Sequence, residues 1–334
     1  MKISNYFSSV LYRETGIRHL EKGKGCEDYV STAYAPETGV KAVALSDGAG
    51  SYKNAAIGSE IVAAVAAKLF AEQFDHLYKL DQETASDYIL QEVLQPLKEL
   101  SHQNHCDLIS YSATLLCAAM HPDGRYIVFH VGDGAIVGYS EKNGCETVSI
   151  YDHDGPANLT TFVTVEHTEY FMKKGAGDYI TFVLMSDGPE DFLVNELGVQ
   201  SRVKIMIQLA YFISEESMME QIAGLVRLFK ENGMGDDASF ALLMDGRATP
   251  EVFEHLNSNL RMMLFGLDSD IGTKKLKRAY DVLTVLSQFP DGITCKQLYR
   301  KLHFHSKKIA KKKLLFMMEM ELIKRENGKY YFLK

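Results

Sequence analysis

Acidic residues stand at the ends of apolar, strand-like runs, and this arrangement constrains the fold more than any other feature of the chain. The runs that are easiest to see are 40–45, 126–131 and 179–185. The acidic sites are Glu27-Asp28, Asp47-Gly48, Asp133-Gly134, Asp187-Gly188 and Asp236-Asp237. A carboxylate at the end of a buried strand is costly unless something compensates its charge. We therefore expect the fold to gather these carboxylates around hard cations.

The composition is that of a folded protein with an ample core, since 46% of the 334 residues are hydrophobic and 24% are charged. This length allows two domains. No apolar run approaches the roughly 18 residues that span a bilayer, and the first 15 residues have no apolar segment of signal-peptide length. We therefore expect a cytoplasmic protein without a membrane partner.

The five cysteines argue against a disulfide framework and against a zinc site. They are odd in number and show no Cys-x-x-Cys spacing. Cys117 lies in an apolar run and is interpreted as a small buried hydrophobe. Cys26 stands beside Glu27, and a nucleophilic thiol there is the less favoured interpretation.

The order of predicted elements favours two sheets with helices packed outside them. Helical patterns cover 54–72, 84–102, 200–213 and 215–231, and strand patterns cover 3–13, 28–35, 111–120, 125–132, 134–140, 179–185 and 238–244. The turn His121-Pro-Asp-Gly124 predicts a hairpin, and 134–140 should continue the same sheet. In the helix 54–72 we expect one buried side, formed by Ile57, Ile61, Val65, Leu69 and Phe70.

The C-terminal part differs in charge and in pattern. Residues 271–334 contain 16 Lys and Arg against 5 Asp and Glu, a balance of +11, while residues 1–270 carry −19. Opposite signs indicate two modules. After a helical linker at 249–274, three helices and a hairpin follow in the order of a winged helix. The signals are helices at 275–289, 295–302 (capped by Thr294) and from Ser306 to Leu322, then a hairpin at 323–333 with Asn327-Gly328 at its tip.

The acidic sites fit metal-assisted phosphate chemistry. Carboxylate and backbone carbonyl oxygens suit Mg²⁺ and Mn²⁺. Two such ions about 4 Å apart can share a carboxylate and activate a bridging water that attacks phosphorus. An Asp-Gly pair suits this role because the missing side chain lets the glycine carbonyl approach an ion. A single Asp-Gly is more often a turn, which is how Asp123-Gly124 and Asp291-Gly292 are interpreted.

Taken in order, six motifs between residues 8 and 245 resemble those of the metal-dependent, type 2C serine/threonine protein phosphatases. They are His19 with Gly25-Cys-Glu-Asp28, Ser46-Asp-Gly-Ala-Gly50, Ser112-Ala-Thr114, Val131-Gly-Asp-Gly134, Met185-Ser-Asp-Gly188 and Gly235-Asp-Asp-Ala238. Each motif is weak alone, but the ordered set is specific. The resemblance implies an α+β fold, a four-layer α-β-β-α sandwich over 1–248. The order of the C-terminal elements, and not the resemblance, predicts the small winged-helix-like domain at 275–334.

The resemblance also implies a role for each acidic residue in binding two Mn²⁺ or Mg²⁺ ions, with a third ion in a weaker site. Asp47 would bridge the two ions, and Asp187 and Asp236 would complete the first site; these three are the expected catalytic residues. The carbonyl of Gly48 and the carboxylate of Asp28, favoured over Glu27, would serve the second site. Asp133 with Asp187 would frame the third, and Asp237 would orient its neighbours by hydrogen bonding. The implied substrate is a protein carrying phosphoserine or phosphothreonine.

The chain departs from the family pattern around the phosphate. Ala49 stands where some members have a histidine, and the phosphate-binding arginine before the acidic pair has no clear match. Arg18, Arg13 and His19 are the candidates. The helical flap of many bacterial members is hard to identify in 145–178.

Two other functions remain open. One is a non-catalytic sensor that uses the phosphatase fold, against which the retention of the metal-binding carboxylates argues. The other is a transcription regulator whose basic tail binds DNA phosphates. The lysines at the start of its third helix are Lys307, Lys308, Lys311, Lys312 and Lys313. Docking of this tail on a protein, or on the acidic core itself, is favoured over DNA binding.

Overall fold

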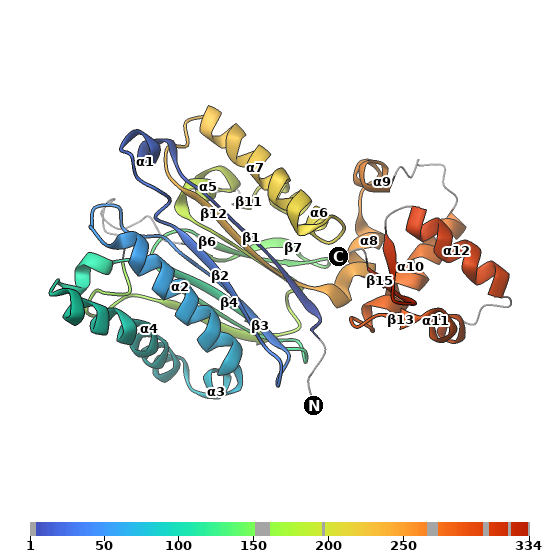
Figure 1. Cartoon of the computed structure of the whole chain (residues 1–334), viewed down its shortest axis with the longest axis horizontal. Coiled ribbons are helices and arrows are strands. Elements are labelled where there is room, and N and C mark those ends of the chain that lie inside the picture. Colours follow the sequence, from blue (N-terminus) through green and yellow to red (C-terminus); the bar gives the residue numbers. More distant parts are fainter. Residues whose placement is uncertain are drawn as a thin grey trace. The chain divides into compact units, whose positions relative to one another are not determined.

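Two antiparallel five-stranded sheets form the centre of the first of two structural units (Figure 1). The computed structural model describes residues 5–150, 161–195, 198–265, 273–302, 307–319 and 322–332. The first unit takes its described residues from 9–204 and 219–244, and the second from 5–8, 205–218 and 245–332. The predicted boundaries at 248 and 274 stay a prediction.

Neighbouring strands run antiparallel in both sheets. In sequence of pairing, the first sheet holds β1 (Phe7–Glu14), β12 (Ala238–Asp245), β9 (Thr181–Met185), β6 (Ala135–Ser140) and β7 (Gly144–Ile150). The second holds β2 (Tyr29–Ala35), β3 (Val40–Ser46), β4 (Leu115–Met120), β5 (Arg125–Val131) and β8 (Phe171–Ala176). The predicted hairpin between β4 and β5 is confirmed, and Gly124 takes a positive φ of 94° at its turn.

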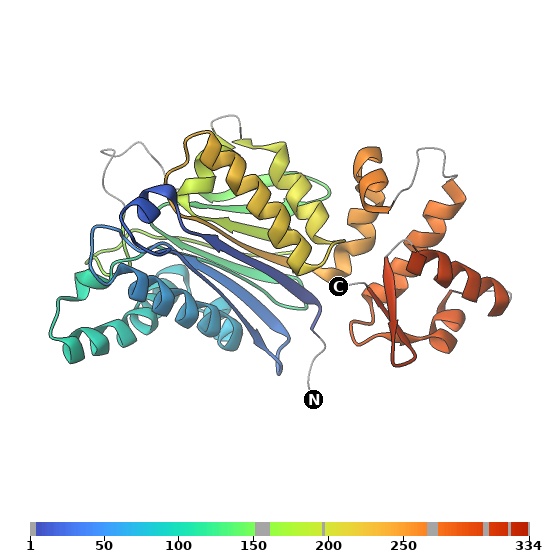
Figure 2. The same cartoon turned by 45° about the horizontal axis from the view of Figure 1, so that its top comes forward.

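Helices cover the outer faces of both sheets (Figure 2). The helices α2 (Ala55–Glu72), α3 (Phe74–Lys79) and α4 (Gln82–Asn104) lie against the second sheet. The helix α7 (Glu215–Glu231) lies across the first sheet. The remaining elements before β12 are α1 (Ile17–Glu21), η1 (Leu108–Tyr111), α5 (Asp187–Leu193), α6 (Ser201–Ala210) and a two-stranded ribbon of β10 (Val194–Asn195) and β11 (Gly198–Val199). The predicted α+β, four-layer α-β-β-α sandwich is confirmed.

The inner faces of the sheets meet in an aromatic core. The ring of Tyr126 in β5 lies 5.3 Å from that of Phe182 in β9 and 5.5 Å from that of Tyr179, centroid to centroid. Edge and tilted contacts of this kind add roughly 1 kcal/mol each to the burial of large rings. This packing fixes the two sheets against each other and so holds the strand ends in place.

The predicted buried side of α2 is confirmed at Leu69 and Phe70 and wrong at Ile57, which is 45% exposed. Ile61 and Val65 are partly buried against the core, and most of the buried positions are small. They are Ala55, Gly58, Ser59, Val62, Ala63, Ala66, Ala67, Leu69, Phe70 and Ala71. A Cβ added at Gly58 would lie 2.1 Å from the carbonyl oxygen of Tyr111. Because the helix packs this closely against its neighbours, small residues form much of its inner face, together with Val62, Leu69 and Phe70.

The expectation that residues 134–140 continue the sheet of the preceding hairpin is also wrong. The strand β6 belongs to the first sheet, whereas β5 belongs to the second. The turn between them contains Gly132 (φ 93°) and Gly134 (φ 91°). These left-handed conformations, which suit glycine, redirect the chain from one sheet to the other within three residues.

The second unit has the predicted order of C-terminal elements. They are η2 (Gly246–Ala248), α8 (Thr249–His255), α9 (Ser258–Phe265), α10 (Thr273–Ser287), β13 (Ile293–Thr294), α11 (Cys295–Lys301), α12 (Lys307–Glu319), β14 (Ile323–Glu326) and β15 (Lys329–Phe332). A capping box at Thr294 begins α11, and Asn327 and Gly328, both with positive φ, form the hairpin tip as predicted. The predicted cap at Ser306 lies outside the described residues. A winged-helix identity stays a prediction.

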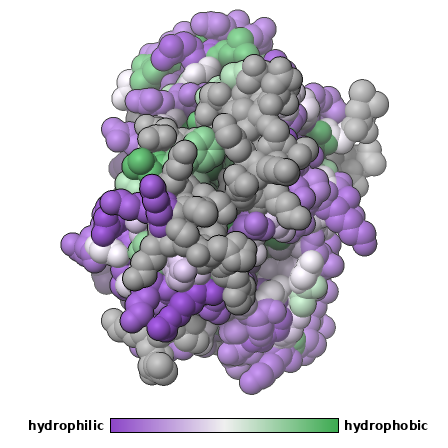
Figure 3. Space-filling view, turned by 90° about the vertical axis from the view of Figure 1, so that its right-hand side faces the viewer, coloured by the Kyte–Doolittle hydropathy of each residue, from purple (hydrophilic) through white to green (hydrophobic). Residues whose placement is uncertain are grey.

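The face of the molecule drawn in Figure 3 is mainly hydrophilic among its coloured residues, with apolar groups scattered between them. Exposed apolar side chains of the second unit include Met262, Met263 and Leu315. Of the five lysines predicted to begin the third helix, Lys308 and Lys311 have described side chains, and both are exposed. A DNA or protein partner for this unit stays a prediction.

Two expectations from composition can be compared with the described residues. All five cysteines are free, and Cys117 is fully buried as predicted. No helix in the described ranges is both long and apolar enough to cross a bilayer.

Candidate active site

The register of the strands brings the acidic sites to one end of the sandwich. The residue pairs that meet at this end are Tyr29 with Ser46, Leu115 with Val131, Ala135 with Met185 and Phe240 with Met185. Each of the five acidic sites lies within four residues of one of these positions. Antiparallel pairing therefore assembles carboxylates that are up to about two hundred positions apart in sequence.

Burial and mutual repulsion raise the pKa values of the central carboxylates. Burial is the largest cause in each case, and it raises the pKa of Asp28 to about 7 and that of Asp187 to about 8. The pKa of Asp47 lies well above its ordinary value because of burial and the charges of Asp28, Asp187 and Asp133. Asp133 and Asp236 act in turn on Asp187. The five predicted carboxylates thus share one electrostatic environment.

The carboxylate of Asp28 is buried without a counter-charge. The residue has no exposed surface, and neither of its carboxylate oxygens makes a hydrogen bond of good geometry among the described residues. The side chains of Ser239 and Ser186 lie near enough to offset part of the rise in its pKa. Buried polar atoms in native proteins are nearly always paired, and an unpaired buried carboxylate is especially costly. A bound cation would satisfy these oxygens, so the residues fit a hard divalent ion.

Within the described residues, no group of three or more His, Cys, Asp or Glu side chains has the geometry to hold a metal ion by itself. Magnesium is commonly held by one or two carboxylates and several waters rather than by a complete protein cage.

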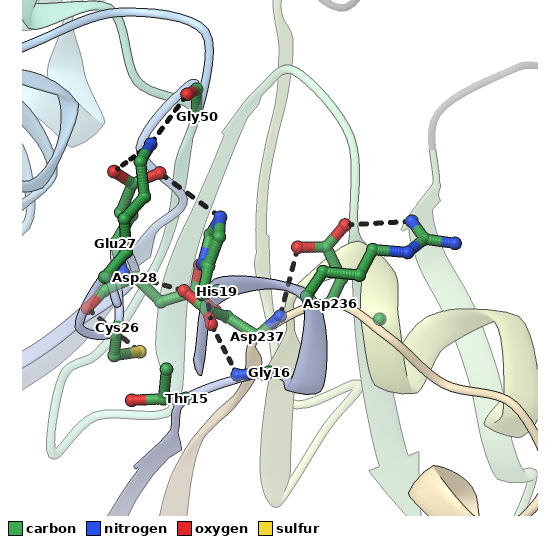
Figure 4. Close-up of polar contacts among 12 residues, drawn as sticks. Thr15, Gly16, His19, Cys26, Glu27, Asp28, Gly50, Asp236 and Asp237 are labelled. Carbon is green, nitrogen blue, oxygen red and sulfur yellow. Dashed lines mark hydrogen bonds and ion pairs between the residues drawn. The ribbon is translucent and has the colours of Figure 1, made fainter. Parts of the chain in front are cut away.

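Asp237 ties three segments of the chain together below the site (Figure 4). Its side chain is 3% exposed and accepts hydrogen bonds from the backbone N–H groups of Gly16 (2.6 Å) and Glu27 (2.7 Å). The Nδ1 atom of His19 lies 3.0 Å from the same carboxylate. Both oxygens of this side chain are therefore engaged, and the orienting role that the resemblance implies for it stays a prediction.

The side chain of Glu27 is held by Lys24 and His19 (Figure 4). The Nζ atom of Lys24 lies 2.9 Å from its Oε1 atom and donates a second hydrogen bond to the carbonyl oxygen of Gly50 (2.9 Å). The Nε2 atom of His19 lies 3.4 Å from Oε2. Glu27 therefore fastens the loop before β2 to the Asp-Gly turn, whereas the neighbouring Asp28 is left without a counter-charge.

The turn that carries Asp47 is fixed by the Ser112-Ala-Thr114 motif. The N–H of Asp47 donates to Oγ1 of Thr114, and the N–H of Thr114 donates to the carbonyl of Asp47, both at 2.9 Å. A Cβ at Gly48 would lie 2.7 Å from the carbonyl oxygen of Ala55 and 2.8 Å from that of Glu27. Only glycine fits here, which explains the Asp-Gly sequence.

Comparison with known proteins agrees with this geometry. The family model described as protein phosphatase 2C matches residues 15–227. The chain belongs to the protein phosphatase 2C family. Enzymes of this family act on phosphorylated proteins and use Mn²⁺ or Mg²⁺, and the chain is accordingly a protein-serine/threonine phosphatase. The predicted family and enzyme class are confirmed. No curated protein matches the chain.

Solved structures of bacterial phosphatases share the fold. The serine/threonine phosphatase Stp1 from Staphylococcus aureus is 17% identical, with a TM-score of 0.52 over 73% of this chain and 97% of that one. The S. agalactiae serine/threonine phosphatase is 18% identical, with a TM-score of 0.52 over 72% and 99% of the two chains. At these identities the likeness concerns the phosphatase fold alone.

The three candidates for phosphate binding in this phosphatase differ in how strongly neighbouring residues hold their side chains. Arg13 donates to the carbonyl of Asp28 (3.0 Å), and its guanidinium lies 4.6 Å from the ring centroid of Tyr29. His19 lies between two acidic side chains. The side chain of Arg18 is 68% exposed and only loosely paired, at 3.8 Å, with Asp236. Arg18 is thus the candidate best able to reach a substrate.

Two residues of the phosphatase site were missed by the sequence analysis. Glu190 is 4% exposed, and burial, with the charges of Asp191 and Asp133, raises its pKa to about 7. Its position one helical turn after Asp187 could have indicated it. His130 is the buried polar residue of β5, and its place in an otherwise apolar run was the available signal.

Two further expectations concern the surroundings of the site. Burial, with the charge of Asp28, raises the pKa of the Cys26 thiol, which disfavours the thiolate that a nucleophile requires. The predicted flap region 145–178 includes residues 151–160, which lie outside the described residues, so its identification stays a prediction.

Proposed function

We propose that this phosphatase hydrolyses phosphoserine and phosphothreonine in proteins with two Mn²⁺ or Mg²⁺ ions held at the acidic end of the sandwich. The proposed ligands are Asp28, Asp47, the carbonyl of Gly48, Asp187 and Asp236, with Asp133 and Asp187 at a third, weaker site. The observation that carries the proposal is the fully buried Asp28 carboxylate, which has no counter-charge and lies in the same environment as Asp47.

Each residue contributes a defined part of the reaction. Asp47 stands on a turn fixed from both sides, so its carboxylate is held in one place for shared coordination. Asp237 and Glu27 keep the surrounding segments fixed by hydrogen bonds and ion pairs. The ions, when bound, supply a nucleophile from water and charge that stabilises the transition state. Because the chain retains the carboxylates proposed to bind metal, a non-catalytic sensor function is disfavoured.

The metal dependence should follow pH in a defined direction. In the metal-free fold, Asp28 and Asp187 have pKa values of about 7 and 8, whereas unfolded aspartates titrate near 4. Between these values the folded protein binds more protons than the unfolded chain, so its stability falls as pH rises from about 4 to about 8. Bound Mn²⁺ replaces these protons, and we expect it to raise Tm more at pH 8 than at pH 5.5.

The test combines thermal melting with hydrolysis of p-nitrophenyl phosphate and a phosphoserine peptide. Chelator-treated protein should lose both activities, and Mn²⁺ should restore them over the pH range in which it raises Tm. Turnover that is unaffected by chelation would refute the proposed mechanism. Equal Mn²⁺-induced shifts in Tm at both pH values would refute the assignment of these buried carboxylates as ligands.

Arg18 is the proposed phosphate-binding residue. We expect Arg18→Ala to raise KM for a phosphoserine peptide by roughly tenfold, since a charge-assisted hydrogen bond contributes about 1.5–3 kcal/mol. The fold should be unaffected because the side chain is mostly exposed. The matched control is Lys22→Ala, which removes one positive charge from the exposed residue directly after α1, the helix that contains Arg18. An equal rise in KM for both variants would show a general effect of charge, and the assignment of Arg18 would be withdrawn.

A further inference from the structure

His130 is a buried titratable residue that the proposed mechanism leaves without a role. It is 4% exposed and lies near the end of β5, one residue before the turn that carries Asp133. Its strand is otherwise apolar from Ile127 to Val131. A polar ring in such a place is costly unless its nitrogen atoms are paired.

Both ring nitrogens have partners. Nδ1 lies 2.8 Å from Oγ of Ser149, and Nε2 lies 3.2 Å from the carbonyl oxygen of Asp133. Ser149 belongs to β7 in the first sheet and His130 to the second, so the ring connects the two sheets directly beneath the turn. Burial lowers the pKa of His130 to about 4, which leaves a neutral ring near pH 7. Since a carbonyl only accepts, Nε2 carries the hydrogen and Nδ1 accepts from the Ser149 hydroxyl.

The backbone of the turn that contains Asp133 has little restraint of its own, so the hydrogen bond from His130 can stabilise it. Asp133 stands between two glycines with positive φ, the residue type that restricts the backbone least. Both glycines are required by their surroundings, because a Cβ at Gly132 would lie 2.6 Å from Cγ2 of Thr114 and one at Gly134 2.6 Å from the carbonyl of Met185. The chain cannot be stiffened at these positions, so a hydrogen bond to the Asp133 carbonyl is a direct way to fix the residue between them.

We propose that His130 is a positioning residue, which fixes the backbone of Asp133 and thereby directs its carboxylate toward the third, weaker metal site. The inference rests on the proposed metal role of Asp133. It assigns to the Nε2–H group the function of an outer-sphere contact, and such contacts typically change metal affinity by about 10- to 100-fold when they are removed.

Two amide substitutions separate the functions of the two ring nitrogens. In His130→Gln the amide nitrogen can reach the position of Nε2 and keep the contact with Asp133. In His130→Asn the amide group reaches only the position of Nδ1, where its oxygen can accept the hydrogen bond from Ser149. We expect the asparagine variant to weaken the weakest Mn²⁺ site about tenfold, and the glutamine variant to retain wild-type affinity. Mn²⁺ binding would be measured by electron paramagnetic resonance, with Tm as the check on folding.

Introducing His130→Asn into the Asp133→Asn variant tests whether His130 acts through Asp133. There, His130→Asn should cause no further loss of Mn²⁺ affinity, whereas a general structural defect would add its own loss. If Asp133→Asn weakens binding but the two His130 variants bind Mn²⁺ equally, the inference on His130 is wrong. If Asp133→Asn leaves every Mn²⁺ site unchanged, the proposed role of Asp133 fails and the inference fails with it.

Ser149→Ala provides a test that leaves the ring in place. Loss of its hydroxyl frees Nδ1 but removes nothing near Asp133, so we expect Mn²⁺ affinity at the weakest site to fall by only about threefold, within the range for one hydrogen bond. Should both His130 variants fail to fold, an unchanged affinity in Ser149→Ala would overturn the inference.

Discussion

Replacement of Asp47 by asparagine is expected to lower kcat/KM for a phosphoserine peptide by at least about a thousandfold. That factor corresponds to about 4 kcal/mol of transition-state stabilisation, which is the scale of the charge stabilisation that a metal centre provides. The change keeps the size of the side chain and leaves the backbone hydrogen bonds to Thr114 in place. It also removes one negative charge from a cluster of repelling carboxylates. The metal-free variant should therefore melt at the same temperature as the wild type or higher.

The matched control is Asp123→Asn, which alters an Asp-Gly pair in the exposed hairpin turn between β4 and β5. Asparagine can still accept the hydrogen bond from the N–H of Arg125 through Oδ1. We expect its kcat/KM to remain within about twofold of wild type, as is usual for surface substitutions. Full activity in Asp47→Asn would show that the metal assignment is wrong. Loss of activity with a lowered Tm would instead indicate a folding defect.

The sequence was informative where a local pattern has only one structural consequence. An apolar run followed by Asp187 predicts both a buried strand and its end, and the strand β9 ends two residues before this aspartate. The hairpin at Gly124 and the cap at Thr294 depend on residues within three or four positions. Such features could be predicted because the residues that determine them are neighbours in the chain.

The failures concern contacts between distant segments. The inner face of α2 depends on how closely the helix approaches Tyr111, which no periodicity in the helix can reveal. The transfer of the chain at Gly132 from one sheet to the other depends on the pairing of β6 with β9. The role of His130 follows from a hydrogen bond to a strand of the opposite sheet. Tertiary packing decides each of these, so the apolar pattern alone was insufficient.

The carboxylates of the site have one property that local sequence predicts and another that depends on tertiary packing. Their identity was accessible because Asp28, Asp47 and Asp187 each occur in a short motif. Their energetic state was not, because the raised pKa values come from burial and from one another. Nor did the sequence show that the two neighbours differ in their partners. Glu27 forms an ion pair with Lys24, whereas the carboxylate of Asp28 lies near the hydroxyl groups of Ser239 and Ser186.

Gly16→Ala is expected to lower Tm by about 6–12 °C and kcat/KM by roughly a hundredfold. The backbone of Gly16 (φ −68°, ψ 157°) suits any residue, so glycine is required by contact and not by conformation. A Cβ there would lie 2.3 Å from the carbonyl carbon and 2.4 Å from the carbonyl oxygen of Asp236. Forcing these backbones apart should cost about 3 kcal/mol, as overpacking does, and 1 kcal/mol changes Tm by about 2–4 °C in a domain of this size.

The loss of activity follows from the position of the same peptide group. The next carbonyl of the segment is closely packed as well, since a Cβ at Gly188 would lie 2.4 Å from the carbonyl oxygen of Asp237, so the segment has little room to shift. Displacement of Asp236 by about 1 Å is sufficient for a hundredfold loss. Gly25→Ala is the matched control, because this glycine lies in the same connection with no atom within 4 Å of its added Cβ. Thermal melting and peptide hydrolysis would be measured for both variants. Equal Tm and equal kcat/KM in the two variants would show that the chain between β1 and β2 tolerates the added methyl group. The fit of Gly16 against Asp236 would then not be what holds this proposed metal ligand in place.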